Sequence, residues 1–272
     1  ERYLKWRSSK RRDRRCCSAN RCGKSHFLVH LGAAALKVGK NVLHYTFELS
    51  ESAVGIRYDS NLCNIPSNEV RENKDLIKEK YEEGEFGRLI IKEYPTGSAS
   101  VLTVRNHIEK LSMKGFIPSV ILIDYADIMR STRQYDSLRH ELKLIYEELR
   151  NLAGELNVPV WTASQSNKEG SEKEVVGLTN MGESYAKAQV ADVVLTLSRK
   201  ETEKSTGMAR LFVAKNRAGR DGLLFPVKID TARSKLKVID DLGALSISDA
   251  VQSSSNNTRS LLKSKWKEIT GE

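Results

Sequence analysis

Two short motifs in this sequence carry residue types that together could bind a nucleoside triphosphate. Gly23-Lys24-Ser25 precedes a helix-forming run, and such a motif offers a lysine to the β- and γ-phosphate oxygens and a hydroxyl to Mg²⁺. Residues 120–124 are branched and apolar until Asp124, which predicts a buried parallel strand that brings a carboxylate to the ligand-binding edge of an α/β sheet. Either motif alone is common, but the two in this order predict a P-loop and its Walker B partner.

Further polar residues follow two other predicted strands. Residues 41–47 predict a strand that ends at Glu48. A carboxylate one strand away from a P-loop can orient and deprotonate the attacking water, although Glu48 could equally be an acid at the start of the next helix. Residues 158–164 predict a buried strand ending at Gln165, whose amide could hydrogen-bond the γ-phosphate. A glutamine there is otherwise an ordinary polar strand end.

A pair of cations follows a strand near the carboxyl end of the chain. Residues 210–214 run into Lys215-Asn216-Arg217, and a glycine-bounded turn leads to a return strand at residues 223–229. Alternate strand positions project to the same side. Two cations on one side of an exposed hairpin suit the triphosphate of a neighbouring subunit. The alternative is a solvated hairpin tip.

Helical and strand patterns alternate along the chain and predict an α/β domain that positions these residues. The predicted helices cover residues 25–38, 67–87, 100–114 and 135–156, and the remaining strands cover residues 88–94 and 191–197. In this arrangement, the ends of parallel strands gather the polar residues at one edge of a sheet.

Composition limits the classes of protein to consider. The chain has 272 residues, of which 39% are hydrophobic, and could hold one large domain with tails. We find no apolar run of membrane-spanning length and no signal-peptide pattern, so we expect a cytoplasmic protein without a membrane partner. The net charge is +10, but residues 1–22 carry +7 of it. The nearly balanced remainder means that any contact with nucleic acid must come from local loops.

Residues 1–22 do not have the composition that a P-loop requires before its glycine-lysine pair. A buried strand should precede the loop, yet this segment is rich in arginine, and Ser18 stands where the first glycine of the motif belongs. Two interpretations stay open: a basic, disordered tail, or a segment translated in a shifted reading frame. One permitted back-translation of residues 6–22, read one base later, encodes a strand that leads into a P-loop. Sequencing the source DNA would distinguish them.

Cysteine usage predicts neither a zinc site nor a disulfide framework. Cys16, Cys17 and Cys22 lie in this first segment, and only Cys63 lies elsewhere. A zinc site needs spaced pairs with further Cys or His ligands, and a disulfide framework needs cysteines that are spread more widely.

Six motifs occur along the chain in one order. They are Gly23-Lys24-Ser25, Thr46-Phe47-Glu48-Leu49-Ser50, Ile123-Asp124-Tyr125, Trp161-Thr162-Ala163-Ser164-Gln165, Gly182-Glu183-Ser184 ahead of Ala191-Asp192-Val193-Val194, and Lys215-Asn216-Arg217. With these motifs the chain resembles the RecA-type motor domain of hexameric replicative DNA helicases of the DnaB class, most closely those of tailed phages. The resemblance covers about residues 23–240. It implies an α/β, RecA-like P-loop NTPase core with a mostly parallel central sheet flanked by helices and a C-terminal β-hairpin.

The resemblance also implies ATP and Mg²⁺ as cofactors, and a role for each motif. Gly23, Lys24 and Ser25 would bind the nucleotide, Ser25 and Asp124 would hold Mg²⁺, Glu48 would activate water, Gln165 would sense the γ-phosphate, and Arg217 with Lys215 would stabilise the transition state in the adjacent subunit. The implied activity is ATP hydrolysis at the subunit interfaces of a ring, coupled to translocation on single-stranded DNA and to unwinding. If a phage encodes the chain, it would act in the cytoplasm of the bacterial host.

Implied partners are single-stranded DNA, further copies of the chain in a ring that is expected to be hexameric, a primase and a helicase loader. Arg130 and Arg133 follow the Walker B motif, and Lys168 follows Gln165. In a ring these side chains would face the central channel and contact DNA phosphates. Surface solvation is the alternative for each of them.

Two departures from the family pattern keep other functions open. The first half of the P-loop is degenerate, and the helical domain that precedes the motor in this family is not apparent, so the chain resembles a fragment. Residues 241–272 predict a linker and one short helix of no assigned use. One alternative is a recombinase-type or clock-type ATPase on the same core. Another is an oligomeric binding or loader subunit that does not hydrolyse ATP.

Overall fold

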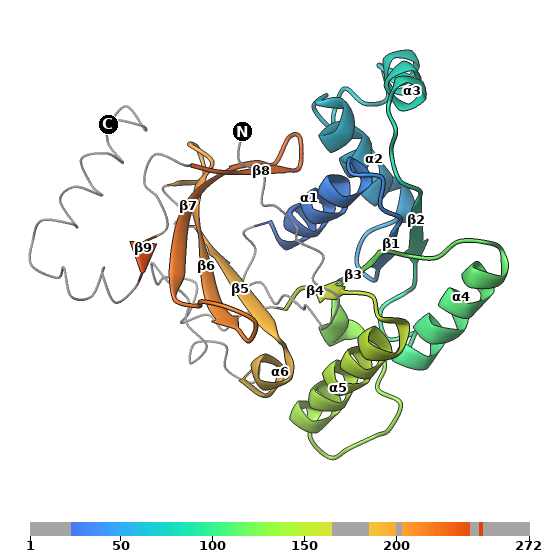
Figure 1. Ribbon diagram of the computed structural model, residues 1–272, viewed down its shortest axis with the longest axis vertical. Helices are drawn as coiled ribbons and strands as arrows, with labels where there is room; N and C mark the ends of the chain where they lie inside the picture. Colours follow the sequence, from blue (N-terminus) through green and yellow to red (C-terminus); the bar gives the residue numbers. More distant parts are fainter. Residues whose placement is uncertain (1–22, 165–184, 200–202, 240–244, 247–272) are drawn as a thin grey trace, which may run out of the picture.

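The computed structural model describes residues 23–164, 185–199, 203–239 and 245–246, which form two sheets and the helices around them (Figure 1). The first sheet is parallel, with the strand order β2-β1-β3-β4. Its strands are β1 (Val42–Thr46), β2 (Leu89–Glu93), β3 (Val120–Asp124) and β4 (Val160–Thr162). The helices around it are α1 (Lys24–Leu36), α2 (Glu51–Cys63), α3 (Lys74–Glu83), α4 (Val101–Met113) and α5 (Leu138–Leu156), and a short 3-10 helix, η1 (Ala126–Ile128), follows β3.

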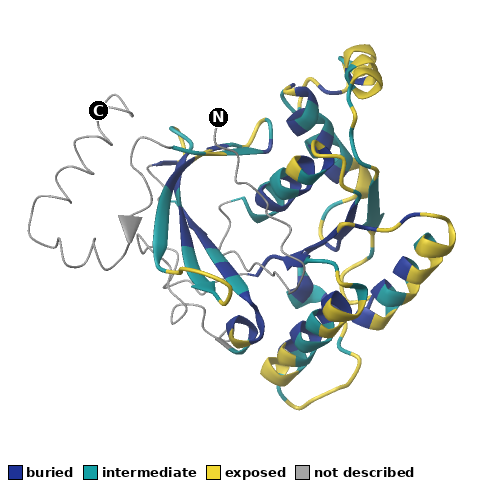
Figure 2. Ribbon diagram, in the orientation of Figure 1, coloured by how far each residue is buried: buried dark blue, intermediate teal, exposed yellow. Residues whose placement is uncertain are grey.

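Alternation along β1 and β3 divides the helices between the two faces of the parallel sheet. Leu43 and Ile121 pack with α4 and α5, whereas Val42 and Leu122 pack with α1 and α2. Because strand residues alternate between faces, a fully apolar strand must be covered on both sides. Both central strands are buried along their whole length, and exposed residues lie on the outer surfaces of the helices (Figure 2). The parallel sheet flanked by helices agrees with the predicted fold class.

The second sheet is antiparallel and is larger than the predicted C-terminal hairpin. It contains β5 (Val193–Ser198), β6 (Met208–Asn216), β7 (Leu223–Asp230) and β8 (Lys235–Val238) in that order, and β9 (Leu245–Ser246) pairs with β7. A short helix, α6 (Tyr185–Val190), precedes β5. The β6–β7 hairpin was predicted from its turn. We did not predict β8, because it is short and alternates lysine with apolar residues.

The two sheets meet at α1 but are not joined by hydrogen bonds. Among the described residues, β4 pairs only with β3, and β5 pairs only with β6. Trp161 of β4 and Leu197 of β5 nevertheless belong to the same apolar cluster as the buried face of α1. β4 is also buried throughout. Each sheet therefore presents a largely buried edge strand beside the helix that follows Gly23.

The helix boundaries follow local capping chemistry. Ser50 accepts a hydrogen bond from the Ala53 amide at the start of α2, and Ser100 and Thr103 form a capping box at the start of α4. The charged segment at residues 67–87 contributes only α3, so the predicted helix was too long. Turns occupy residues 67–72, where Pro66 and several polar residues do not sustain an amphipathic face.

Candidate nucleotide-binding site

The carboxyl edge of the parallel sheet brings Glu48 and Asp124 onto neighbouring strands. Thr46 is in register with Asp124, and the Phe47 amide donates a hydrogen bond to the Asp124 carbonyl at 2.8 Å. Glu48 follows directly and is exposed. The charges of Glu48 and Lys24 are both close enough to affect the pKa of Asp124. Three of the predicted site residues therefore lie at one edge of the sheet.

Asp124 is a buried carboxylate whose side chain lacks a hydrogen-bond partner. The residue is 1% exposed, and neither carboxylate oxygen has a partner within hydrogen-bonding geometry among the described residues. Burial raises its pKa, and the adjacent Ser25 and Lys24 side chains oppose that shift. A buried, unpaired carboxylate is costly in a folded protein, so the arrangement fits a bound cation. Because Mg²⁺ is commonly held by few protein ligands together with phosphates and water, Ser25 and Asp124 fit such an ion.

The Lys24 ammonium lies over an aromatic ring at the beginning of α1. Its Nζ is 4.3 Å from the centroid of the Tyr125 ring and is buried without a hydrogen-bond partner in the described part of the chain. Burial lowers the pKa of Lys24, whereas the charges of Asp124 and Glu48 raise it. An ammonium placed in this way can donate to phosphate oxygens without first breaking a hydrogen bond.

Gly23 supplies the backbone conformation that begins α1 at this site. Its φ of +103° is in the region that glycine tolerates and L residues rarely adopt. The Gly23 carbonyl accepts the Phe27 amide, so the helix starts at once and its first N–H groups lie next to Lys24. A helix N-terminus of this kind attracts anions such as phosphate.

Arg57 on α2 also belongs to this site, and the sequence analysis did not identify it. Its Nη1 atom is buried without a hydrogen-bond partner in the regions that the structure describes. Burial lowers the pKa of Arg57, while the charges of Asp124 and Glu48 oppose the shift. Val54 and Tyr58, its neighbours on the helix, face the core. The signal in the sequence was an arginine at helical spacing from core residues in the helix after Glu48.

Lys215 and Arg217 contact their own subunit. Lys215 Nζ donates to the carbonyls of Ala188 and Gln189, and Arg217 donates to the Gln189 carbonyl and to Asp192. The shared contact at Gln189 means that the two cations do project to the same side. The side chain of Arg217 is still 44% exposed. The structure thus places these residues beside α6, and not free in solvent at a hairpin tip.

The predicted DNA-binding residues are only partly described. Arg130 and Arg133 are exposed in the segment between η1 and α5. Gln165 and Lys168 lie outside the described residues. Ser164, immediately before Gln165, is buried and donates to Asp127 at 2.8 Å.

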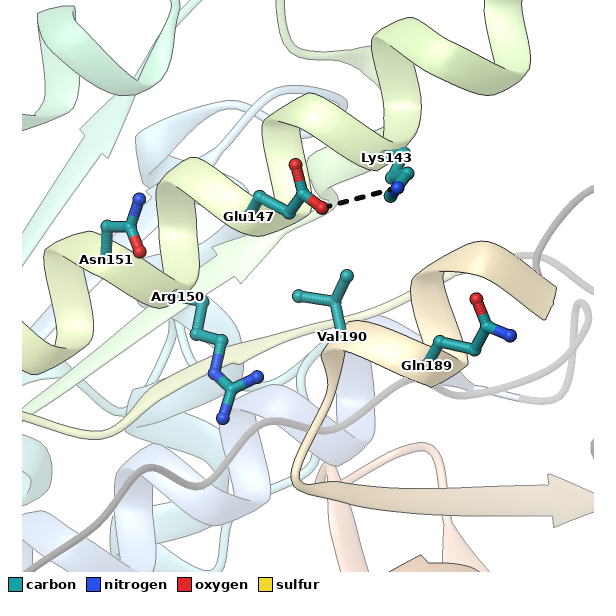
Figure 3. Close-up of a pocket in the computed structure, with 6 residues that line it drawn as sticks. All are labelled: Lys143, Glu147, Arg150, Asn151, Gln189 and Val190. Atoms are coloured by element: carbon teal, nitrogen blue, oxygen red, sulfur yellow. Dashed lines mark ion pairs between the residues drawn. The ribbon is translucent and has the colours of Figure 1, made fainter.

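An open hollow between α5 and α6 lies apart from the residues of the nucleotide site. Its lining consists of Lys143, Glu147, Arg150, Asn151, Gln189 and Val190 (Figure 3). None of these is a P-loop or Walker B residue. Arg150, which borders the hollow, extends to Asp192 and donates to its Oδ1 at 3.1 Å.

Neither a metal cluster nor a membrane span is found within the residues that the structure describes. No group of three or more His, Cys, Asp or Glu side chains there could hold a metal ion. No helix there is both long and apolar enough to cross a membrane. Cys63 is buried and is not in a disulfide.

A lysine and hydroxyl at a helix N-terminus, beside a strand-end carboxylate on a parallel sheet, define a RecA-like P-loop nucleotide-binding domain. The family described as "DnaB-like helicase C terminal domain" matches residues 17–231. The chain belongs to that family. A "DnaB-like replicative helicase" of Enterobacteria phage T4 is 33% identical over 190 residues, 66% of this chain and 40% of its own length. A "Replicative DNA helicase DnaB" of Leifsonia xyli is 28% identical over 208 residues, 72% of this chain and 45% of its own length.

A solved structure of a DnaB-like replicative helicase, studied with its interactions with primase, shares the fold at low sequence identity. Its TM-score is 0.70 at 16% identity, with coverage of 84% of this chain and 58% of that chain. A second solved structure, of an isolated ATPase domain, has a TM-score of 0.72 at 16% identity, with coverage of 85% of this chain and 86% of that domain. The chain spans less than half the length of the two relatives described above.

Proposed function

We propose that this chain is the ATP-driven motor of a replicative DNA helicase, which hydrolyses ATP at the interfaces of a ring and thereby translocates on single-stranded DNA. The observation that carries the proposal is the adjacent pair of buried, unpartnered charges, Lys24 Nζ and the Asp124 carboxylate. Opposite charges without hydrogen bonds inside a domain suit a ligand that carries both a polyanion and a cation. ATP with Mg²⁺ is such a ligand.

Each residue has a defined task in this mechanism. Lys24 and the first N–H groups of α1 bind the phosphates, and Ser25 with Asp124 would hold Mg²⁺, which neutralises charge on the phosphates when it is bound. Glu48, exposed next to Asp124, accepts a proton from the attacking water. Arg57 adds a cation from the other side of Glu48 and Asp124. Gln165 would report the presence of the γ-phosphate to the segment that follows it.

Arg217 and Lys215 would complete the site of the adjacent subunit. The partly exposed guanidinium of Arg217 supports this role, because a cation supplied across an interface must reach the surface of its own subunit. Such a cation stabilises the charge that develops in phosphoryl transfer. The proposal includes a hexameric ring, single-stranded DNA in its channel, and contacts with a primase and a loader.

The interruption between β4 and β5 identifies where the strand before the P-loop would fit. That strand must end at Gly23, and α1, which follows Gly23, packs on the cluster shared by β4 and β5. Buried edge strands leave backbone groups without partners. An apolar strand at this position would pair with both and unite the two sheets.

The decisive experiment replaces residues 1–22 with an apolar strand and a complete P-loop sequence, and then measures ATP hydrolysis with and without single-stranded DNA. DNA should stimulate hydrolysis in the repaired protein, and Lys24→Ala should abolish it. The repaired protein should also melt at a higher temperature than the unaltered chain. Unwinding of a forked duplex would separate a helicase from a recombinase-type or clock-type ATPase.

One observation favours the second candidate, a binding or loader subunit that does not hydrolyse ATP. Ser18 stands in place of the first P-loop glycine. If the repaired protein assembles and binds DNA but hydrolyses no more ATP than its Lys24→Ala variant, this second function replaces the first.

A further inference from the structure

A buried ion pair connects the end of the Walker B strand to α6. Asp127 of η1 follows Asp124 closely, and its Oδ2 lies 2.8 Å from the Nζ of Lys187 on α6. The same carboxylate accepts hydrogen bonds from Tyr146 on α5 at 2.7 Å and from Ser164 after β4 at 2.8 Å. Three elements are therefore held by one side chain at the end of β3.

Lys187 has few alternatives to this position. The residue is only 3% exposed, and its Nζ also lies 3.4 Å from the Ser164 hydroxyl and 5.7 Å from the centroid of the Tyr146 ring. A buried ammonium must keep its counter-ion, because separating the two leaves an uncompensated charge inside the protein. Any displacement of η1 should consequently move α6 with it.

The other end of α6 holds the two cations proposed to act on the neighbouring subunit. Lys215 Nζ donates to the carbonyls of Ala188 and Gln189 at 2.7 and 3.0 Å, and Arg217 donates to the Gln189 carbonyl at 2.8 Å. Cations are favoured at a helix C-terminus, where carbonyl groups lack partners within the helix. The Arg217 amide further donates to the Asp192 carbonyl at 2.9 Å, directly after the helix.

We propose that α6 is a rigid link between the two nucleotide sites that each subunit serves, with Lys187 as the positioning residue that attaches Arg217 to the subunit's own Walker B strand. This inference rests on the proposed action of Arg217 across the subunit interface. Changes at Asp124 on nucleotide binding or hydrolysis are passed through Asp127 and Lys187 to α6. The helix then shifts Lys215 and Arg217 relative to the adjacent triphosphate.

A test on the unaltered chain uses amide hydrogen exchange. Lys187→Met keeps the length of the side chain and removes its charge, while Lys143→Met removes an ion-pairing lysine from the surface of α5 as a matched control. We expect exchange in residues 192–195 and 215–217 to accelerate at least about tenfold in Lys187→Met, the scale of a local opening made easier by one lost contact. β1 should be unaffected. Equal protection of residues 215–217 in Lys187→Met and Lys143→Met would overturn the proposed link.

A test of function uses mixed rings of subunits that carry the repaired P-loop. Arg217→Ala subunits accept a cation from a neighbour, and Glu48→Gln subunits can only donate one, so a mixture should recover ATPase activity that each lacks alone. Adding Lys187→Met to the donor should reduce this recovery by at least about fivefold, although Arg217 is present. A donor that recovers the parental rate would contradict the role of Lys187.

Two controls separate loss of position from loss of folding and from failure of the proposed function. A donor with Asp127→Asn and Lys187→Met removes both charges, which avoids a buried unpaired carboxylate; its recovery should stay low although it is folded, and full recovery would overturn the proposal. If the parental donor and acceptor form mixed rings without recovering activity, the interface role of Arg217 itself has failed.

Discussion

Arg217 and Asp192 form an ion pair within one subunit, with Nη1 of the arginine 2.8 Å from Oδ1 of the aspartate. The same oxygen accepts a hydrogen bond from Arg150 at 3.1 Å. Asp192 is buried, whereas both arginines are partly exposed. The aspartate therefore determines where the two guanidinium groups lie, and it does so directly after α6.

Replacing Asp192 should impair hydrolysis in the neighbouring site more than folding. Asp192→Asn retains the backbone contact to Arg217 but loses the charge, so we expect ATPase activity of the assembled, repaired protein to fall on the order of tenfold. The free energy of unfolding should fall by no more than about 1–2 kcal/mol, because the arginines can be solvated. ATPase assays and urea unfolding would measure both quantities. Unchanged activity would indicate that the ion pair does not position Arg217.

Glu48→Gln should separate nucleotide binding from hydrolysis in the repaired protein. The substitution removes the general base while it keeps size and polarity, so hydrolysis should fall at least about a hundredfold. Because Glu48 is exposed, stability should change by less than about 0.5 kcal/mol. Binding of a fluorescent ATP analogue should persist. Hydrolysis near the parental rate would exclude Glu48 from the mechanism.

Arg57→Gln should lower activity without lowering stability. The Nη1 atom of Arg57 is buried without a hydrogen-bond partner among the described residues, so removal of the charge relieves a desolvation cost. We expect the melting temperature to stay constant or rise, and the ATPase rate to fall at least about tenfold if Arg57 stabilises phosphate charge. A melting temperature that drops together with activity would assign Arg57 a structural role instead.

Three basic residues should contribute to the salt dependence of DNA binding. Replacing Arg130, Arg133 and Lys168 with alanine should lower the slope of log affinity against log salt concentration by about 2, since each contact to a single-strand phosphate contributes about 0.7. The matched control replaces three exposed lysines of α3, α4 and the residue after α4, Lys78, Lys110 and Lys114, and should keep the parental slope. Fluorescence anisotropy with labelled oligonucleotide would measure it, and equal slopes in both triple variants would contradict the channel assignment.

Acid should destabilise the fold partly through His44. Burial lowers the pKa of His44 from 6.5 to about 3, and its Nδ1 lies 2.9 Å from the Tyr58 hydroxyl. Between pH 6.5 and 3 the unfolded chain therefore binds a proton that the folded chain excludes. Stability from this group is present above pH 6.5 and is lost as the pH falls, at up to about 1.4 kcal/mol per pH unit.

His44→Gln should flatten that dependence, because glutamine offers Tyr58 an acceptor and does not titrate. Urea unfolding at pH 7 and pH 5 would measure the difference for the parent and the variant. His26 and His30, whose pKa values are lowered to about 4 by burial, titrate in both proteins and should leave a common remaining slope. Identical slopes in parent and variant would mean that His44 takes up its proton without unfolding.

The family, the fold class and the order of the main elements could be predicted from the sequence because their signals are local. An apolar run ending in Asp124, a glycine-lysine-serine motif before a helix, and a turn between β6 and β7 each occupy a few consecutive residues. Strand alternation and helix periodicity then indicate which faces are buried.

The tertiary structure alone decided which charges meet. Arg57, Asp127 and Lys187 lie in segments without a recognised motif, and their partners are distant in sequence: Arg57 acts near Asp124, and Lys187 pairs with Asp127. The same holds for Arg217, whose contacts with Gln189 and Asp192 depend on how β6 packs beside α6. Periodicity shows that a side chain is buried or exposed, but only the packing of elements determines the counter-ion that makes a buried charge tolerable.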